Sequence, residues 1–327
     1  MQKRQLGSGG PFVSAIGLGC LSFGGLFGAT NLDDSLRCLD AAWDCGINFL
    51  DVANIYGNGV SEEVIGTWLR SRPHRPFIAT KASIVNGPNR RVDNSRDHLR
   101  SELESSLRRL GVEKVDLFYM HRHEFARPIE EVAETMAELV REGKIGGYGL
   151  SEIAPYTLRR AHSVHPVSAV QNEYSLWTRS PELGLIQTCA ELGVAFVPFS
   201  PLARGAFGDP MLDPDFQDLG PFRSQIPRFS AENWPANKAK ILQYRALAKD
   251  MGHTPAALAI AWVLHRGNHL IPIPGTRTAA HLRAWASADE IRLTDADMSA
   301  IEAVLPIGWA HGDRYNDDMA ASVERYC

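Results

Sequence analysis

The sequence lacks a membrane-spanning segment, a signal peptide and a strong excess of charge of either sign. No stretch approaches the roughly 20 apolar residues that a membrane-spanning helix needs, and the N-terminus has no apolar core of the kind that signal peptides carry. A formal net charge of -4 on 327 residues gives no basic surface for nucleic acid or anionic lipid. We therefore expect a cytoplasmic protein that binds neither nucleic acid nor membranes.

A disulfide framework is also missing. The cysteines are odd in number and show no C-x-x-C spacing, which is typical of free thiols in a reducing compartment and argues against structural zinc. They stand at Cys20, Cys38, Cys45, Cys189 and Cys327.

What the chain does contain is a regular alternation of short apolar segments with helical patterns, which is typical of βαβ units. Nearly continuous apolar strands indicate a parallel sheet buried on both faces. Glycines that follow the helical patterns, such as Gly46, Gly111 and Gly143, suit helix C-termini. The expected strands are Ile16–Cys20, Phe49–Val52, Phe77–Lys81, Val115–His121, Gly146–Ser151, Val167–Asn172, Ala195–Ser200 and His269–Pro274.

Eight such strands suit either a closed barrel or an open doubly wound sheet. The open sheet that binds dinucleotides normally shows G-x-G-x-x-G after its first strand, and Gly17-Leu18-Gly19 lacks the third glycine. We predict an α/β fold, a (β/α)8 TIM barrel that forms one domain over residues 1–327. Residues 203–235 are expected to form a lid or rim loop at the C-terminal face, and residues 294–327 an extra helix and a tail.

Reactive side chains cluster at the expected strand ends, where TIM barrels carry their chemistry. Asp51, Lys81 and His121 end three strands, and Tyr56 follows the first of these. A buried lysine is costly unless it is paired, so Asp51 is its expected partner; a purely structural ion pair is the alternative. A phenol has a pKa of about 10, and a nearby ammonium lowers that pKa. With His121 orienting the oxygen, the set suits protonation of a carbonyl oxygen by Tyr56 while another agent attacks the carbon.

Metal-dependent hydrolysis is the competing barrel chemistry. His121-Arg122-His123 could place two imidazoles on one face of a strand. The strand ends at Ser151, Asn172 and Pro274 add no histidine, so we expect no metal and interpret His123 as a loop residue.

Short segments spread over essentially the whole chain resemble the aldo/keto reductase superfamily. Their order and spacing carry the likeness more than any one of them. They are Leu18-Gly19-Cys20, FLDVANIYG at 49–57, Ile78–Lys81, Asp116–His121, Gly149–Ser151, Phe199–Leu202 and Ile273–Arg277. The sequences HRHEF at 121–125, QNEYSLW at 171–177 and GDRYNDDM near the C-terminus look most similar to the bacterial pyridoxal-reductase-like branch.

The resemblance implies metal-free reduction of aldehydes or ketones by NADPH, with NADH a less favoured donor. It implies that Tyr56 is the acid, that Asp51 and Lys81 tune it, and that His121 orients the carbonyl. In the cofactor site, Ser151 and Gln171 would bind the carboxamide. Phe199 would stack on the nicotinamide, Ser200 and Leu202 would meet the phosphates, and Arg277 the 2′-phosphate. The full implied set is Gly19, Cys20, Leu21, Asp51, Ser151, Glu152, Gln171, Phe199, Ser200, Leu202, Gly275, Thr276, Arg277 and His281.

Several positions depart from the family pattern, among them Phe199, which replaces the frequent Tyr. Glu152 replaces the commoner Asn and cannot donate to a carboxamide oxygen; His281 stands where some members carry Arg; Ala284-Trp285 replaces a Glu-Asn pair that contacts adenine. A different class of function is an NADP(H)-sensing regulatory or interaction subunit with little turnover. Neither the carbonyl substrate nor the oligomeric state follows from the sequence.

Overall fold

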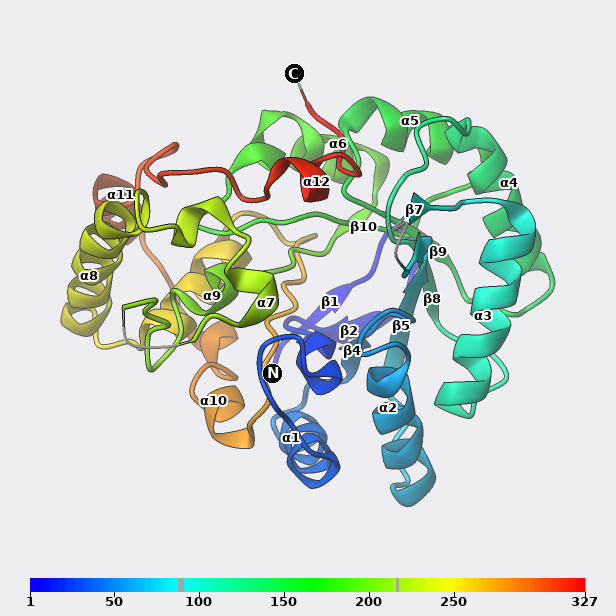
Figure 1. Ribbon diagram of the computed structural model, residues 1–327, viewed down its shortest axis with the longest axis horizontal. Helices are drawn as coiled ribbons and strands as arrows, with labels where there is room; N and C mark the ends of the chain where they lie inside the picture. Colours follow the sequence, from blue (N-terminus) through cyan, green and yellow to red (C-terminus); the bar gives the residue numbers. More distant parts are fainter. Residues whose placement is uncertain (88–90, 216–217, 327) are drawn as a thin grey trace.

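The protein forms a parallel sheet that curls into a barrel with helices outside it (Figure 1). The computed structural model describes residues 1–87, 91–215 and 218–326. The seven strands of the sheet lie side by side in the order of the sequence. They are β3 (Leu18–Gly19), β4 (Phe49–Asp51), β5 (Phe77–Ala82), β8 (Leu117–Met120), β9 (Tyr148–Ser151), β10 (Ala169–Gln171) and β11 (Ala195–Phe196).

Residues 269–275 close the barrel between β11 and β3, where the eighth strand was expected. Ile271 N–H donates to Phe196 O at 2.9 Å, and Gly19 N–H donates to Pro274 O at 3.0 Å. The pairing stays at the level of isolated parallel bridges. Pro272 and Pro274 explain this, because each lacks the N–H that a ladder requires. The predicted TIM barrel is confirmed, and its eighth strand pairs with its neighbours through isolated bridges.

The helices form the outer layer of the barrel (Figure 1). Among the described residues, no helix is both long and apolar enough to cross a membrane. The helices that follow the strands are α1 (Leu32–Asp44), α2 (Val60–Ser71), α3 (Arg96–Leu110), α4 (Ile129–Arg141), α5 (Pro155–Val164), α6 (Leu185–Leu192), α8 (Trp234–Asp250), α9 (Pro255–His265) and α10 (Ala279–Arg283).

Helix ends fall where the sequence signals them. Gly111 ends α3 in the left-handed conformation at φ 71°, which glycine adopts without the steric penalty of a Cβ. Thr254 caps α9 through Ala257 N–H, and Thr294 forms a capping box at α11 (Asp295–Val304). The short helices are α7 (Gly220–Arg223), α12 (Asp317–Ala320) and the 3-10 turns η1 (Leu21–Gly24), η2 (Ser180–Leu183), η3 (Ala203–Gly205), η4 (Pro227–Phe229) and η5 (Ala288–Glu290).

Two hairpins were not anticipated from the sequence. β1 (Lys3–Gln5) pairs with β2 (Phe12–Ser14), and β6 (Ile84–Val85) pairs with β7 (Arg91–Val92). The first hairpin brings Val13 against apolar residues of the barrel interior. Strands of two or three residues carry too little alternation for a sequence pattern to reveal them.

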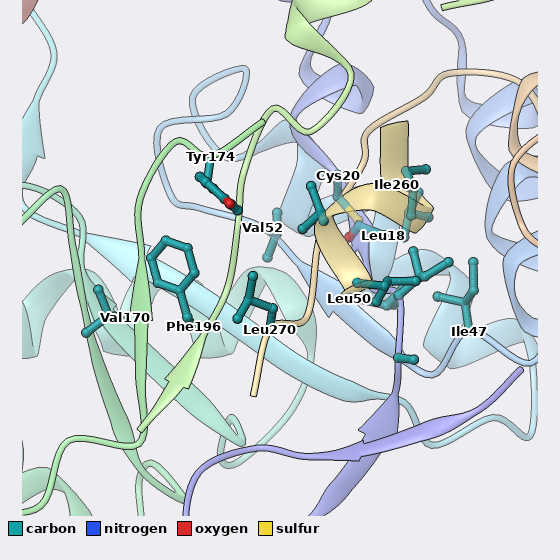
Figure 2. Packing of buried hydrophobic residues seen from close by; sticks show 14 of the residues in the cluster. Leu18, Cys20, Ile47, Leu50, Val52, Val170, Tyr174, Phe196, Ile260 and Leu270 are labelled. Atoms are coloured by element: carbon teal, nitrogen blue, oxygen red, sulfur yellow. The ribbon is translucent and has the colours of Figure 1, made fainter. Parts of the chain in front are cut away.

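Side chains alternate across the barrel wall, as they do along any strand. Phe49, Leu117 and Ala169 belong to the apolar cluster inside the barrel. The cluster between strands and helices includes Leu18, Leu50, Val52, Val170, Phe196 and Ile260 (Figure 2). Residue parity therefore decides which side of the wall a strand residue faces.

Gly149 shows how tightly the interior is filled. A Cβ at this position would lie 2.3 Å from Tyr119 Cε1 and 2.8 Å from Ala169 O. We expect Gly149→Ala to lower the free energy of unfolding by about 1–3 kcal/mol, because the added methyl group overpacks the barrel. Urea denaturation measures the change, with Ser101→Ala at an exposed position of α3 as the control, which should stay within about 0.5 kcal/mol. Equal stabilities for the two variants would contradict this packing.

Candidate active site

A cavity of about 700 Å³ opens at the C-terminal ends of the strands. Its size lies within the range of ligand sites in proteins. Most of the expected site residues line it: Gly19, Leu21, Asp51, Tyr56, His121, Ser151, Gln171, Phe199, Ser200, Leu202, Gly275, Thr276, Arg277 and His281.

Cys20 and Glu152, which were expected to bind the cofactor, do not line this cavity. Both are fully buried. Both residues come directly after the last residue of their strands, β3 and β9. Cys20 belongs to the apolar cluster outside the barrel wall. Glu152 has a left-handed backbone conformation at φ 56°, and its carboxylate pairs with Arg314.

The centre of the site is a buried ion pair between neighbouring strands. Lys81 on β5 is without solvent exposure and pairs with Asp51 on β4. Its Nζ also donates to Val52 O at 2.8 Å, and Gln171 Nε2 donates to the other Asp51 oxygen at 2.7 Å. Burial lowers the pKa of Lys81, but attraction to Asp51 and Tyr56 outweighs it and raises that pKa above its ordinary value. The ammonium therefore stays charged.

Tyr56 lies against this pair. Lys81 Nζ is 5.2 Å from the centre of the Tyr56 ring. Burial raises the pKa of Tyr56 above its ordinary value, although the Lys81 charge, the Arg122 charge and a hydrogen bond with Lys81 lower it. This corrects the expectation of a lowered pKa for Tyr56. The phenol is a protonated donor at neutral pH, and Lys81 stabilises the phenolate that remains after donation.

Glycines set the position of the Tyr56 backbone. A Cβ on Gly24 would lie 2.5 Å from Gly57 N and 2.6 Å from the Tyr56 carbonyl carbon. The turn at η1 therefore packs directly on the segment that presents Tyr56.

The two histidines of the H-x-H sequence have separate surroundings. The ring of His121 lies edge-on to Tyr56, with 5.9 Å between the ring centroids. His123 contacts Glu324 Oε1 at 2.6 Å and Arg127 O at 3.1 Å, on the tail side. Within the part of the chain that the structure describes, no group of three or more His, Cys, Asp or Glu side chains is arranged to hold a metal ion.

Arg122 is a cavity residue that the sequence interpretation passed over. Its Nη1 donates to His121 O at 2.7 Å and to Ser151 Oγ at 3.3 Å. The guanidinium thus lies between the end of β8 and the end of β9, beside the residues expected around a carbonyl and a carboxamide.

Residues 203–235 supply further cavity walls, including Arg204, Phe222 and Arg223. Arg223 lies over the Phe27 ring at 4.3 Å, and Phe27 meets Phe222 edge-on at 5.7 Å between centroids. This segment therefore reaches the loop after η1 across the barrel mouth. Its assignment as a lid stays a prediction.

Arg223 and Arg277 form no ion pair with any described carboxylate, although both line the cavity. Burial, together with the charges of Arg277 and Arg204, lowers the pKa of Arg223 to about 10. An anion between these guanidiniums would relieve their repulsion. The nearby helix α10 has only five residues, so the anion-binding character of this corner comes from the side chains.

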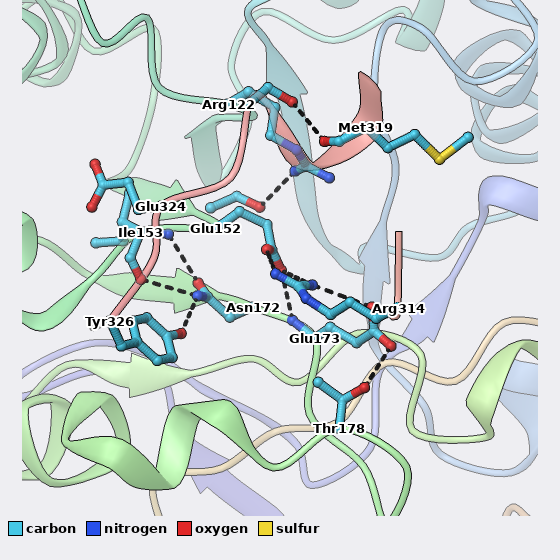
Figure 3. Close-up of polar contacts among 12 residues, drawn as sticks. Arg122, Glu152, Ile153, Asn172, Glu173, Thr178, Arg314, Met319, Glu324 and Tyr326 are labelled. Carbon is cyan, nitrogen blue, oxygen red and sulfur yellow. Dashed lines mark hydrogen bonds and ion pairs between the residues drawn. The ribbon is translucent and has the colours of Figure 1, made fainter. Parts of the chain in front are cut away.

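The C-terminal tail is fastened beside the cavity by two buried glutamates. Glu152 pairs with Arg314, and Glu173 pairs with Arg314 at 3.3 Å (Figure 3). Glu173 also pairs with Arg204 at 2.7 Å. Further along, Asn172 Nδ2 donates to Tyr326 Oη at 2.6 Å. These contacts place three tail residues on the cavity wall: Tyr315, Met319 and Ser322.

The sequence from residue 15 to residue 306 matches the aldo/keto reductase family model. A probable aldo-keto reductase 1 from Glycine max is 40% identical over 326 residues, covering 98% of this chain and 93% of the relative. Aldo-keto reductase str7 from Strobilurus tenacellus is 38% identical over 317 residues, covering 94% and 93%.

Solved structures agree. The glycerol dehydrogenase AKR11B4 from Gluconobacter oxydans has a TM-score of 0.84 at 29% identity, covering 93% of this chain and 94% of that one. The aldo-keto reductase AKR11C1 from Bacillus halodurans, in its holo form, has a TM-score of 0.77 at 26% identity, covering 97% and 99%.

The ion pairs of Glu173 with Arg204 and Arg314 predict a pH-dependent stability. Burial raises the pKa of Glu173, but Arg204, Arg314, Arg228 and a hydrogen bond from Thr178 outweigh it and lower that pKa to about 2, from 4.5. A depressed folded-state pKa stabilises the fold above the unfolded value and stops doing so as the pH falls towards 2.

We expect Glu173→Gln to lower the free energy of unfolding by about 3 kcal/mol at neutral pH, because it leaves buried guanidiniums without their carboxylate. The difference from the wild type should shrink as the pH falls from 4.5 towards 2. Urea unfolding across that range measures it, with exposed Glu134→Gln on α4 as the control. A difference that stays constant with pH would contradict the assigned pairing.

Proposed function

The chain belongs to the aldo/keto reductase family, whose members generally reduce carbonyl compounds with NAD(P)H, and from that premise we propose that it reduces aldehydes or ketones to alcohols with NADPH. The observation that carries the proposal is that Asp51, Tyr56 and His121 line one cavity, while Lys81 is buried behind them and contacts both Asp51 and the Tyr56 ring. A purely structural Asp51–Lys81 pair would not require a phenol and an imidazole that both face the cavity.

Each of the four side chains has a separate task. Tyr56 donates its phenolic proton to the carbonyl oxygen of the substrate. Lys81 stabilises the phenolate that this leaves, and Asp51 keeps Lys81 charged and in place. His121, whose ring lies edge-on to that of Tyr56, orients the carbonyl oxygen. General acid catalysis of this kind contributes about 10²- to 10⁴-fold in rate.

The residues present fit a nicotinamide dinucleotide phosphate. When bound, NADPH supplies the hydride that the carbonyl carbon receives. Phe199 offers an aromatic face for a nicotinamide ring. Arg277 and Arg223 offer two cations without carboxylate partners for the phosphates, which compensates for histidine at position 281.

Removal of the phenolic hydroxyl tests the assigned acid. We expect Tyr56→Phe to lower kcat for 4-nitrobenzaldehyde by about 10²- to 10⁴-fold, because no other group replaces the proton donor. NADPH oxidation followed at its absorbance maximum gives the rate, and fluorescence titration shows whether the cofactor still binds. Tyr156→Phe, at an exposed position on α5, is the matched control. Full turnover by Tyr56→Phe would contradict the mechanism.

The cofactor preference has its own test. We expect Arg277→Met, and separately Arg223→Met, to raise the KM for NADPH by about 10- to 100-fold and to leave the KM for NADH nearly unchanged, because a charge-assisted contact to phosphate is lost. Arg283→Met, an exposed residue of α10 outside the cavity lining, is the control. Equal losses with both cofactors would contradict a phosphate contact.

The alternative, an NADP(H)-sensing subunit, predicts a different outcome. It predicts tight NADPH binding by the wild type with negligible oxidation across a panel of aldehydes that includes pyridoxal. That result would overturn the proposed reduction.

A further inference from the structure

The side chains that line the cavity carry an unbalanced positive charge. Arg122, Arg204, Arg223 and Arg277 all line it. Arg204 is neutralised by Glu173. The carboxylates on the lining are also committed, since Asp51 pairs with Lys81 and Asp209 with Arg245. Three guanidiniums therefore face the cavity without a described carboxylate.

These three cations lie in two different places. Arg277 follows the closing segment 269–275, and Arg223 lies close enough to Arg277 for their charges to repel. Arg122 follows β8, and β8 is four positions away from the closing segment in either direction around the eight-membered ring. Arg122 is thus on the opposite side of the barrel mouth. A phosphate bound by Arg223 and Arg277 would therefore not neutralise the charge of Arg122.

The contacts of Arg122 hold it without neutralising it. Its Nη1 donates to two neutral oxygens, His121 O at 2.7 Å and Ser151 Oγ at 3.3 Å. The guanidinium is partly buried, so water screens it less than it screens a surface arginine. It directly follows the histidine that faces Tyr56.

We propose that Arg122 binds an anionic group of the substrate, so that the preferred substrates are aldehydes or ketones with a carboxylate close to the carbonyl. The inference rests on the proposed carbonyl reduction and deepens it. A guanidinium presents parallel N–H donors that match a carboxylate. The tail residues Met319 and Ser322 line the same cavity.

Arg122 could instead donate to the carboxamide oxygen of the cofactor, because it contacts Ser151, which is expected to bind that carboxamide. The experiment must therefore separate substrate from cofactor. Rates are measured with 2-, 3- and 4-carboxybenzaldehyde and with their methyl esters, which keep the ring and the aldehyde and remove the charge.

We expect the wild type to prefer one or more of the acids over its ester in kcat/KM, and Arg122→Met to reduce that ratio by about 10- to 100-fold. Arg122→Lys should restore part of the ratio, because the charge returns without the planar fork. Exposed Arg37→Met on α1 is the charge-matched control and should leave the ratio unchanged.

Binding without turnover gives a second measurement. Calorimetry of benzoate with the NADP⁺-bound protein should show binding to the wild type that Arg122→Met weakens, whereas neutral benzamide should not discriminate between them. Loss of NADPH affinity in Arg122→Met with an unchanged acid-to-ester ratio would assign Arg122 to the cofactor and overturn the proposal. A wild type that reduces acids and esters equally would also overturn it and would leave the proposed reduction intact. Benzoate binding that depends on Arg122 in a protein that reduces nothing would uphold the anion site and overturn the proposed reduction.

Discussion

A buried ammonium group stays charged only if a carboxylate lies beside it. The site depends on Asp51, which is the carboxylate that pairs with Lys81. Both side chains face the barrel interior because they share the parity of Phe49 and Ala79, two residues earlier on the same strands. Gln171 from the far side of the barrel fixes the second carboxylate oxygen. Asp51, Lys81 and Gln171 thus connect three strands, β4, β5 and β10. The charges of Asp51 and Lys81 set the electrostatic potential at Tyr56.

The barrel must be closed for these charges to lie beside a ligand in the cavity. Residues 269–275 close the barrel, and in this segment Pro272 and Pro274 have no backbone N–H to donate. The same segment carries Arg277 to the mouth, while the tail is drawn over the other side by Glu152, Glu173 and Arg314. One end of the cavity is thus rich in cations that suit phosphate, and the other is bounded by the tail and Arg122.

The sequence predicts the barrel and the places of all eight strands, although the eighth pairs only through isolated bridges. It also predicts Asp51 and Lys81 on neighbouring strands, because long periodic patterns and strand parity are local properties. Cys20 and Glu152 were misplaced because both follow the last residue of a strand, where side chains no longer alternate; Glu152 adopts φ 56°. Arg223 and the tail contacts are different. Their positions depend on where irregular loops return to the barrel, and no local pattern encodes a contact such as Arg314 with Glu173, 141 residues apart. The predicted direction of the pKa shift of Tyr56 was wrong for a related reason: burial raises this pKa, and a sequence motif does not show how deeply a side chain is buried.

The most direct test of the account is the ionisation of Tyr56 itself. Tyrosine labelled with ¹³C at the ring carbon that bears the hydroxyl would be followed by NMR against pH, and Tyr56→Phe would identify its signal among the eight tyrosines. The account predicts that Lys81→Met raises the pKa of Tyr56, because the ammonium that stabilises the phenolate is gone and Asp51 remains. An unchanged or lowered pKa in Lys81→Met would contradict the central role of the ion pair.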